Sequence, residues 1–231
     1  MKSAVFIASV GRPKQLAKAV NSVPKEYKVL IHCNDVSKDA NVEFNRAVEI
    51  CAYPEMSRDD RTNLAMKKLD GFNVMIICDD TRIFPDTISL AEEKLKEKFN
   101  GTMGVCGVKY YNIGHTKGFC EFAFCLYGNE WINQFTDRKM CSGVYNQYYI
   151  DYEWFVNAVS RGCWTFCEEA EMVHKHILSQ KGSSEEYNKR MLRDKDIFEK
   201  RCKDGRCWGI TEGCLNPVNK IEIKIVKKGE K

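Results

Sequence analysis

Short apolar runs alternate with amphipathic stretches along the first hundred residues of the chain. Polar or turn-forming residues bound each apolar run, which is typical of buried strands, and each amphipathic stretch carries its apolar residues at helical spacing. The helix expected at 57–69 begins with Ser57 and Asp60 in a loose capping box, and those expected at 13–21 and 85–99 begin with a proline. The predicted strands are 4–9, 27–35 and 72–78. Strands and helices in alternation predict a parallel sheet covered by helices.

The pattern changes in the second half of the chain. Residues 103–111 and 119–128 are rich in glycine and aromatic side chains, and we expect antiparallel or edge strands there. Amphipathic spacing predicts helices at 151–162 and 183–202, while the stretch 41–52 is ambiguous. Two further short strands are expected, at 164–167 and 171–176.

The final stretch, KIEIKIVKKGEK, alternates charged residues with Ile221, Ile223 and Ile225. This alternation predicts a half-buried strand with a basic outer face. An edge strand protected by lysines and a surface for an anionic partner both fit the pattern. The predicted fold class is α/β, with a mostly parallel central sheet flanked by helices and a C-terminal extension of one helix and one strand.

Composition narrows the class of protein. The chain has 231 residues, 44% hydrophobic and 29% charged, with a net charge of +4, as in an ordinary water-soluble domain. No apolar stretch approaches the roughly 20 residues of a membrane span, and the N-terminal apolar run is too short for a signal peptide. Most of the 12 cysteines lie in apolar runs, where we expect buried free thiols in a reducing cytoplasm. The spacing of Cys202, Cys207 and Cys214 matches a zinc site poorly.

Two adjacent carboxylates, Asp79 and Asp80, follow a buried strand in the sequence NVMIICDDTRIFPD. Like charges repel each other, so their placement needs a reason. Ligands of a parallel sheet gather at the carboxyl ends of its strands, where a paired carboxylate is suited to hold a divalent cation and, with it, phosphate groups. The alternative is that one aspartate caps the loop and the other is solvated. The other strand ends expected at this edge are 9–12, 33–35 and 174–176.

Six motifs in a fixed order resemble those of nucleotide-sugar glycosyltransferases with the GT-A fold, nearest to glycosyltransferase family 2. They are IASVGRP, HCND, RTNLAM, IICDDTRIFPD, IDYEWFVNAVSRG and AEMVHKH, and they run from about residue 3 to residue 177. The resemblance implies a nucleotide-sugar-binding half at 1–100 and an acceptor or catalytic half of the same domain at 101–177. It leaves 178–231 as an extension that we expect to pack on this domain or on a second subunit of a homodimer.

The resemblance assigns nucleotide contacts to three segments. The acidic residue after the second strand, Asp35, corresponds to the base contact, although it also fits a plain turn residue. The family's Arg-Asn pair corresponds to Arg61 and Asn63, with the arginine displaced by one position, and Arg58 one turn earlier competes for the same phosphate or base contact. The family's first loop, which touches the nucleotide, corresponds to Val10, Gly11 and Arg12.

The resemblance also implies a cation site for Mn²⁺ or Mg²⁺. Aligned on Pro85 and Asp86, Cys78 stands where the family has its first acid. Asp80 then becomes the metal ligand and Asp79 the supporting, ribose-side carboxylate. His174, after the last short strand, corresponds to a histidine that reaches the metal or the diphosphate, although a lone histidine is more often structural.

Asp151 takes the place of the family's catalytic base, and Ile150 replaces the glutamate before it. A helix start stabilises the anion and lowers its basicity, and a plain N-cap is the alternative reading. The implied reaction is inverting, metal-dependent transfer from a nucleoside diphosphate sugar, with UDP as the expected carrier. The expected acceptor is a glycan or a hydroxylated base of viral DNA, in the cytoplasm of a bacterium or of a virus-infected host cell.

Three other functions compete with this interpretation. A sugar nucleotidyltransferase needs a longer glycine-rich basic loop than GRPKQ, and an aspartate-based phosphotransferase needs an order that the sequence DDT breaks. A non-catalytic sugar- or nucleic-acid-binding protein on a degenerate transferase scaffold stays open, since Cys78 and Ile150 stand where acids are usual.

Overall fold

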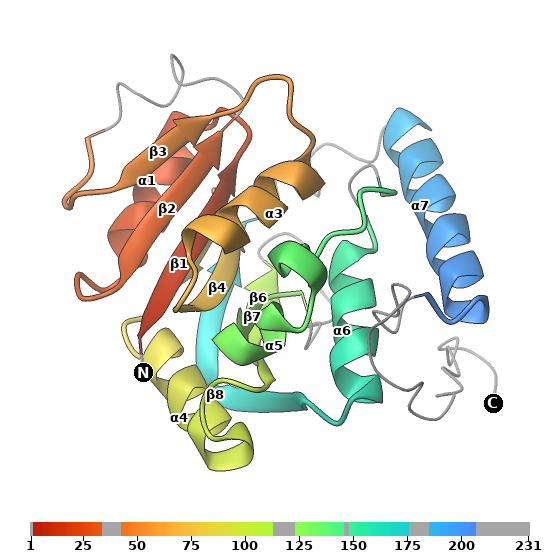
Figure 1. Cartoon of the computed structure of the whole chain (residues 1–231). Helices are drawn as coiled ribbons and strands as arrows, with labels where there is room; N and C mark the ends of the chain where they lie inside the picture. The colour runs from red at the N-terminus through yellow and green to blue at the C-terminus, as the bar shows by residue number, and fades with distance from the viewer. Residues whose placement is uncertain (1, 34–42, 113–122, 146–147, 176–184, 207–231) are drawn as a thin grey trace, which may run out of the picture.

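The computed structural model describes residues 2–33, 43–112, 123–145, 148–175 and 185–206, which form one mixed sheet with helices on both faces (Figure 1). The strands are β1 (Ser3–Ser9), β2 (Lys28–Cys33), β3 (Glu49–Ala52), β4 (Asn73–Cys78), β5 (Thr81–Ile83), β6 (Val105–Asn112), β7 (Cys125–Tyr127) and β8 (Trp164–His174). The helices are α1 (Pro13–Ser22), α3 (Arg58–Lys68), α4 (Thr87–Phe99), α5 (Asn129–Asn133), α6 (Ile150–Ser160) and α7 (Glu185–Lys203), with a 3₁₀ turn η1 (Thr136–Arg138).

The strands lie in the order β3-β2-β1-β4-β7-β6-β8-β5. β1, β2, β3 and β4 pair in parallel, β6 pairs in parallel with β8, and only β7 and β5 run against their neighbours among the strands described. The predicted α/β class with a mostly parallel sheet is therefore confirmed. Its carboxyl edge collects the ends of β1, β2, β4 and β8, as the strand pattern predicted, and also the end of β6, which the pattern did not place there.

Each strand of the first half contributes to two separate cores, because parallel strands are buried on both faces. Val5 and Ile7 of β1 pack under α1 and α4, whereas Ala4 and Phe6 of the same strand pack under α3, α5 and α6. In Figure 1, α3 and α5 accordingly lie in front of the sheet and α1 behind it. This three-layer arrangement leaves the strand ends as the place where polar side chains of several elements meet.

Local sequence explains where the first helices begin. α1 starts at Pro13, where a missing backbone N–H is harmless. α3 starts after Ser57, whose hydroxyl accepts a hydrogen bond of 3.0 Å from the backbone N–H of Asp60. Asp60 accepts in turn from the Ser57 hydroxyl rather than from its N–H, so the capping box is partial. α4 begins at Thr87 rather than at the expected Pro85.

The second half differs from the expectation at α5 and η1, which the sequence pattern did not predict, and at β8. Residues 164–167 and 171–174, predicted as two strands, form the single strand β8. The residues between them bulge out, because Cys167 pairs with Val108 of β6 while Glu171 already pairs with Lys109. The polar bulge, Glu168 to Ala170, broke the apolar pattern along the sequence without ending the strand. β3 places a strand within the ambiguous stretch 41–52.

The sheet curls so that β5, the last strand in the order, lies beside the end of β4 in the middle of the sheet. β5 follows β4 after only two residues, yet it pairs with β8 at the far edge of the order. Thr81 of β5 lies opposite His174 of β8, and the N–H of Lys175 donates to the carbonyl of Asp80 at 2.9 Å. The curl thereby brings the end of β8 beside the end of β4.

Three further expectations concern the chain as a whole. Nine cysteines lie in the described part of the chain, and all of them are free thiols. No helix in the described ranges is long and apolar enough to cross a membrane. The expected strand at 221–225, Cys207 and Cys214 lie outside the described residues, and the division at residues 100 and 177 stays a prediction.

Candidate active site

The loop after β1 holds Asp79. This carboxylate is fully buried and accepts hydrogen bonds from the hydroxyl of Ser9 and the backbone N–H of Val10, both at 3.1 Å. Arg12 adds an ion pair to its other oxygen. Gly11 has a φ of +81°, which a glycine adopts without strain, and this turn carries Arg12 back toward β4. The side chain of Val10 points outward and is 59% exposed.

Asp80 lies between a permanent cation and a histidine. Its Oδ2 accepts from Nη1 of Arg12 at 2.8 Å, and its Oδ1 faces Nε2 of His174 at 3.3 Å. Burial alone would raise the pKa of Asp80, but His174 and Arg12 outweigh it, so the pKa is lowered from its ordinary value. Asp80 is therefore an anion at neutral pH.

Arg12 is the cation that allows two adjacent carboxylates to be buried. The sequence predicts a divalent cation as the partner of Asp79 and Asp80, or else a loop cap with one solvated carboxylate. In the structure both carboxylates are buried, and Arg12, from 67 and 68 positions earlier in the chain, bridges them. The divalent cation stays a prediction. A contact of Arg12 with a nucleotide stays a prediction.

A second group of charged residues lies at the starts of two helices: Arg58 begins α3, and Asp151 is in the first turn of α6. Burial raises the pKa of the half-buried Asp151, and the positive charge of Arg58 opposes this shift without cancelling it. The backbone N–H groups at the helix start lower this pKa, as expected, but burial outweighs them. The charge of Arg58 also acts on Cys78, whose pKa burial raises to about 11, so the thiol stays neutral. Arg58 thus links the end of β4 to the start of α6.

The other predicted nucleotide-binding residues of α3 point inward. Arg61 is 7% exposed, and its backbone carbonyl is hydrogen-bonded to Nδ1 of His32 at 2.9 Å. Asn63 donates to the carbonyl of Cys141 at 3.0 Å and accepts from its N–H at 2.9 Å. These bonds tie α3 to the chain before α6 and give Asn63 a structural role. Its contact with a nucleotide stays a prediction, and Asp35 lies outside the described residues.

Sequence reasoning missed two polar residues of this region. Ser9 was noticed only as a strand end, although its hydroxyl bonds Asp79. Asp59 is 3% exposed and accepts a hydrogen bond of 3.1 Å from the N–H of Gly143, and burial raises its pKa to about 6. The only signal for Asp59 was its position beside Arg58 in the first turn of a helix.

The residues at the end of β4 fit a hard divalent cation only in part. Asp80 Oδ1 and His174 Nε2 lie side by side at 3.3 Å, as two ligands of one metal ion do. No group of three or more such ligands occurs within the described ranges. Mg²⁺ and Mn²⁺ need few protein ligands when substrate phosphates and water complete the coordination. The donor set therefore fits a cation that arrives with a diphosphate.

Comparison with known proteins adds fold-level support. No family model and no curated protein matches the sequence. Among solved structures, the glycosyltransferase TarS of S. aureus (residues 1–349) is similar with a TM-score of 0.57 and 16% identity, over 76% of this chain and 60% of that one. Its complexes with UDP-GlcNAc and with UDP match with a TM-score of 0.55 and 15% identity. These two matches cover 82% and 88% of this chain and 64% and 72% of theirs.

The similarity to TarS shows the fold. The chain spans about 60% of the length of the first TarS structure, and the identity is low. The GT-A-like glycosyltransferase fold predicted from the sequence is confirmed, while membership of glycosyltransferase family 2 stays a prediction.

Proposed function

We propose that the protein transfers a sugar from a UDP-sugar to an acceptor hydroxyl, with inversion at the anomeric carbon. One observation carries the proposal: Asp79, Asp80, Arg12 and His174 meet at the carboxyl edge of a sheet with a glycosyltransferase fold. Donors bind at this edge in open α/β sheets. The crystal structures of TarS with UDP and UDP-GlcNAc support a UDP-linked donor.

The donor side must stabilise a diphosphate that gains negative charge as the sugar leaves. The positive charges of Arg12 and Arg58 both act on Cys78 at the end of β4, and both side chains are suited to bind phosphate oxygens through several N–H groups. Asp80 and His174 would hold Mn²⁺ or Mg²⁺, which would supply further positive charge to the departing diphosphate. Arg12 would then move from the aspartates to the diphosphate, while hydrogen bonds from the Ser9 hydroxyl and the N–H of Val10 keep Asp79 in place.

The acceptor side needs a carboxylate that removes the proton of the attacking hydroxyl. Asp151 fits this role because burial raises its pKa and makes it a better base than an exposed aspartate. Arg58 keeps it ionised by its positive charge. The acceptor is a hydroxyl of a glycan or of a hydroxylated base in viral DNA.

Calorimetry with UDP tests the donor site. We expect UDP to bind more tightly with Mn²⁺ than with EDTA, and Asp80→Asn to remove this difference while the fold persists. The asparagine keeps an acceptor for Arg12, which alanine would not. Equal UDP affinity with Mn²⁺ and with EDTA in the wild-type protein would refute the metal assignment. A panel of labelled UDP-sugars with both acceptor classes, read by mass shift, then identifies the reaction.

A second candidate function is binding without catalysis. It is favoured by Cys78, a neutral, half-buried thiol at the place where the family that the sequence resembles has its first acid. Slow hydrolysis of the UDP-sugar distinguishes the two functions. A transferase releases UDP and loses this activity in Asp151→Ala, whereas a binding protein releases none in either form.

A further inference from the structure

Helix α7 contacts the chain on both sides of Asp151. Before it, the N–H of Tyr148 donates a hydrogen bond of 2.9 Å to Oδ2 of Asp194, which is fully buried. After it, Glu153 accepts two hydrogen bonds from the guanidinium of Arg201, at 2.8 and 2.6 Å. The residues that bracket the proposed base are therefore both bonded to the same helix.

The start of α6 needs such support. Its N-cap residue, Tyr149, has a left-handed backbone with φ +67° and makes no capping hydrogen bond with its side chain. A non-glycine residue in this conformation persists only when surrounding contacts impose it. The ring of Tyr149 packs against Phe198 of α7 with centroids 5.5 Å apart, and Tyr152 packs against the same ring at 5.9 Å.

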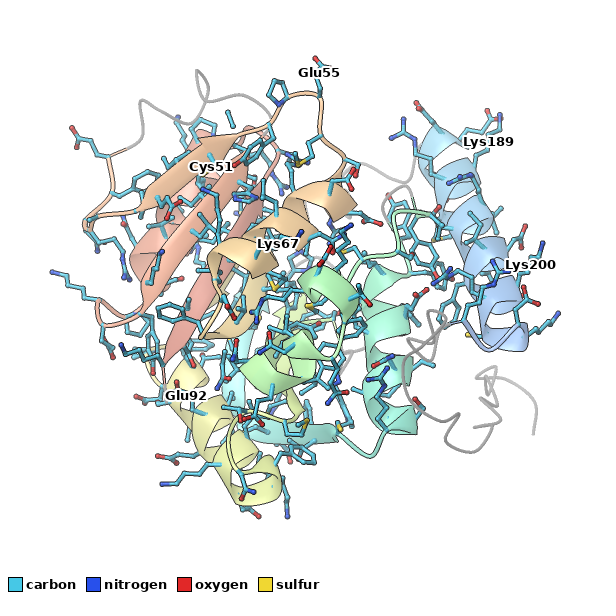
Figure 2. The ribbon with its side chains drawn as sticks, in the orientation of Figure 1. Cys51, Glu55, Lys67, Glu92, Lys189 and Lys200 are labelled. Atoms are coloured by element: carbon cyan, nitrogen blue, oxygen red, sulfur yellow. The ribbon has the colours of Figure 1, made fainter. Side chains whose placement is uncertain are left out.

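The residues of α7 that make these contacts share one face. Asp194, Phe198 and Arg201 are spaced by four and three positions, which places them in one row on a helix. Phe198 is 6% exposed and joins the core formed with α3, α5 and α6. Figure 2 shows Lys189 and Lys200 on the side of α7 that faces away from α6. One face of α7 is thus built around residues 148–153 and the other faces solvent.

We propose that α7 positions the catalytic carboxylate: Asp194, Phe198 and Arg201 hold the first turn of α6 so that Asp151 points at the acceptor hydroxyl. This inference rests on the proposed function. Asp194 and Arg201 are positioning residues, since they act through Tyr148 and Glu153 and do not touch the reacting atoms. A small displacement of a catalytic group lowers turnover strongly while donor binding is left intact.

Two substitutions at Asp194 test the proposal. Asp194→Ala removes the acceptor for the Tyr148 N–H, whereas Asp194→Asn keeps an oxygen there. We expect kcat to fall about tenfold or more in the alanine variant, with the donor KM and the UDP affinity unchanged, and to stay near the wild-type value in the asparagine variant. Hydrogen exchange at the Tyr148 amide should become faster in the alanine variant alone.

Arg201→Met gives an independent readout through Glu153, and Lys189→Met is the control. Lys189 pairs with Glu185 at 2.8 Å on the exposed face, so its loss changes charge without touching α6. A donor KM that rises in step with the loss of kcat, or an unchanged kcat despite faster exchange at Tyr148, would refute the positioning role. Absence of turnover in the wild-type protein with every donor would count against the transferase itself, and the exchange experiment would still report whether α7 restrains this turn.

Discussion

Nη1 of Arg12 donates a 2.8 Å hydrogen bond to Oδ2 of Asp80, and this bond joins the loop after β1 to the end of β4. A cation that binds Oδ1 of Asp80 therefore competes with the positive charge that Arg12 already places on the other oxygen of the same carboxylate. The diphosphate of a donor offers Arg12 other oxygens, so donor and cation should favour each other's binding.

Replacing Arg12 tests this competition. We expect Arg12→Gln to bind Mn²⁺ about tenfold more tightly than the wild type without UDP, a gain of about 1.4 kcal/mol, because a positive charge beside Asp80 is lost. The same change should lower the melting temperature, since two buried carboxylates lose their counter-charge. Electron paramagnetic resonance of free Mn²⁺ measures the affinity. Lys14→Gln, an exposed charge change on α1, is the control, and equal Mn²⁺ affinity in both variants would contradict the competition.

Replacing Asp151 tests the base. We expect Asp151→Asn to lower kcat by about 10²–10⁴, with little change in UDP affinity, because only proton removal is lost. In the wild type, the rate should rise with pH through the Asp151 pKa, which burial places above the ordinary value of 3.8, and this limb should vanish in the variant. Nuclear magnetic resonance of the product reports its anomeric configuration. A product that retains the donor configuration would refute both inversion and this role.

Asp59 should make stability depend on pH. Its pKa is about 6 in the folded protein and about 3.8 when unfolded, so the folded state binds the proton more tightly. Stability from this group is fully present below pH 3.8 and is lost as pH rises through 6. Asp59→Asn keeps the acceptor for Gly143 and should gain on the order of 2 kcal/mol at pH 8, and much less at pH 4. Thermal melts at both pH values measure this, with the exposed Glu55→Gln as the control. An equal gain at both pH values would contradict the assignment.

Truncation tests the C-terminal extension. Removal of everything after Ser179 deletes α7, and we expect a lower melting temperature because Phe198 and the Arg201–Glu153 pair are removed. Truncation after Arg206 keeps α7 and separates its effect from that of the remaining tail. If nucleic acid is the acceptor, truncation after Ser179 should also flatten the salt dependence of DNA binding, by roughly one unit of slope for each phosphate that the tail binds. A melting temperature unchanged by both truncations would show that the extension adds no stability.

The order of strands and helices was predictable because it depends on local pattern. Parallel strands buried on both faces are nearly continuous apolar runs, and Ser57 and Pro13 mark helix starts within a few residues. β5 was missed because three residues, Thr81 to Ile83, carry too little pattern to distinguish a strand from a loop. β8 was divided in two because its bulge is polar.

The chemistry of the site was predictable only in part. Adjacent aspartates after a strand indicated a special position, but no local signal connects Arg12 to residues 67 and 68 positions away. The face of α7 was also hidden, because it mixes an aspartate, a phenylalanine and an arginine rather than forming an apolar stripe. The apolar residues of this helix predict a narrow packing stripe that includes Leu192, Ile197 and Phe198. Ile197 and Phe198 pack in the core, whereas Leu192 is 54% exposed. Both the Arg12–aspartate contacts and the contacts of α7 join buried charged groups to partners that are far away in the sequence, so local pattern does not reveal them.

The curl of the sheet has a mechanical consequence. Asp79 and Asp80 are the whole connection between β4 and β5, and the three residue steps from Cys78 to Thr81 span at most about 11 Å. One end of this tether is fixed in the middle of the sheet and the other at its far edge, so the two carboxylates cannot swing when a ligand arrives. Any closure around a donor must then come from the walls of the site, through side chains such as Arg12 and Arg58, while its floor stays stiff.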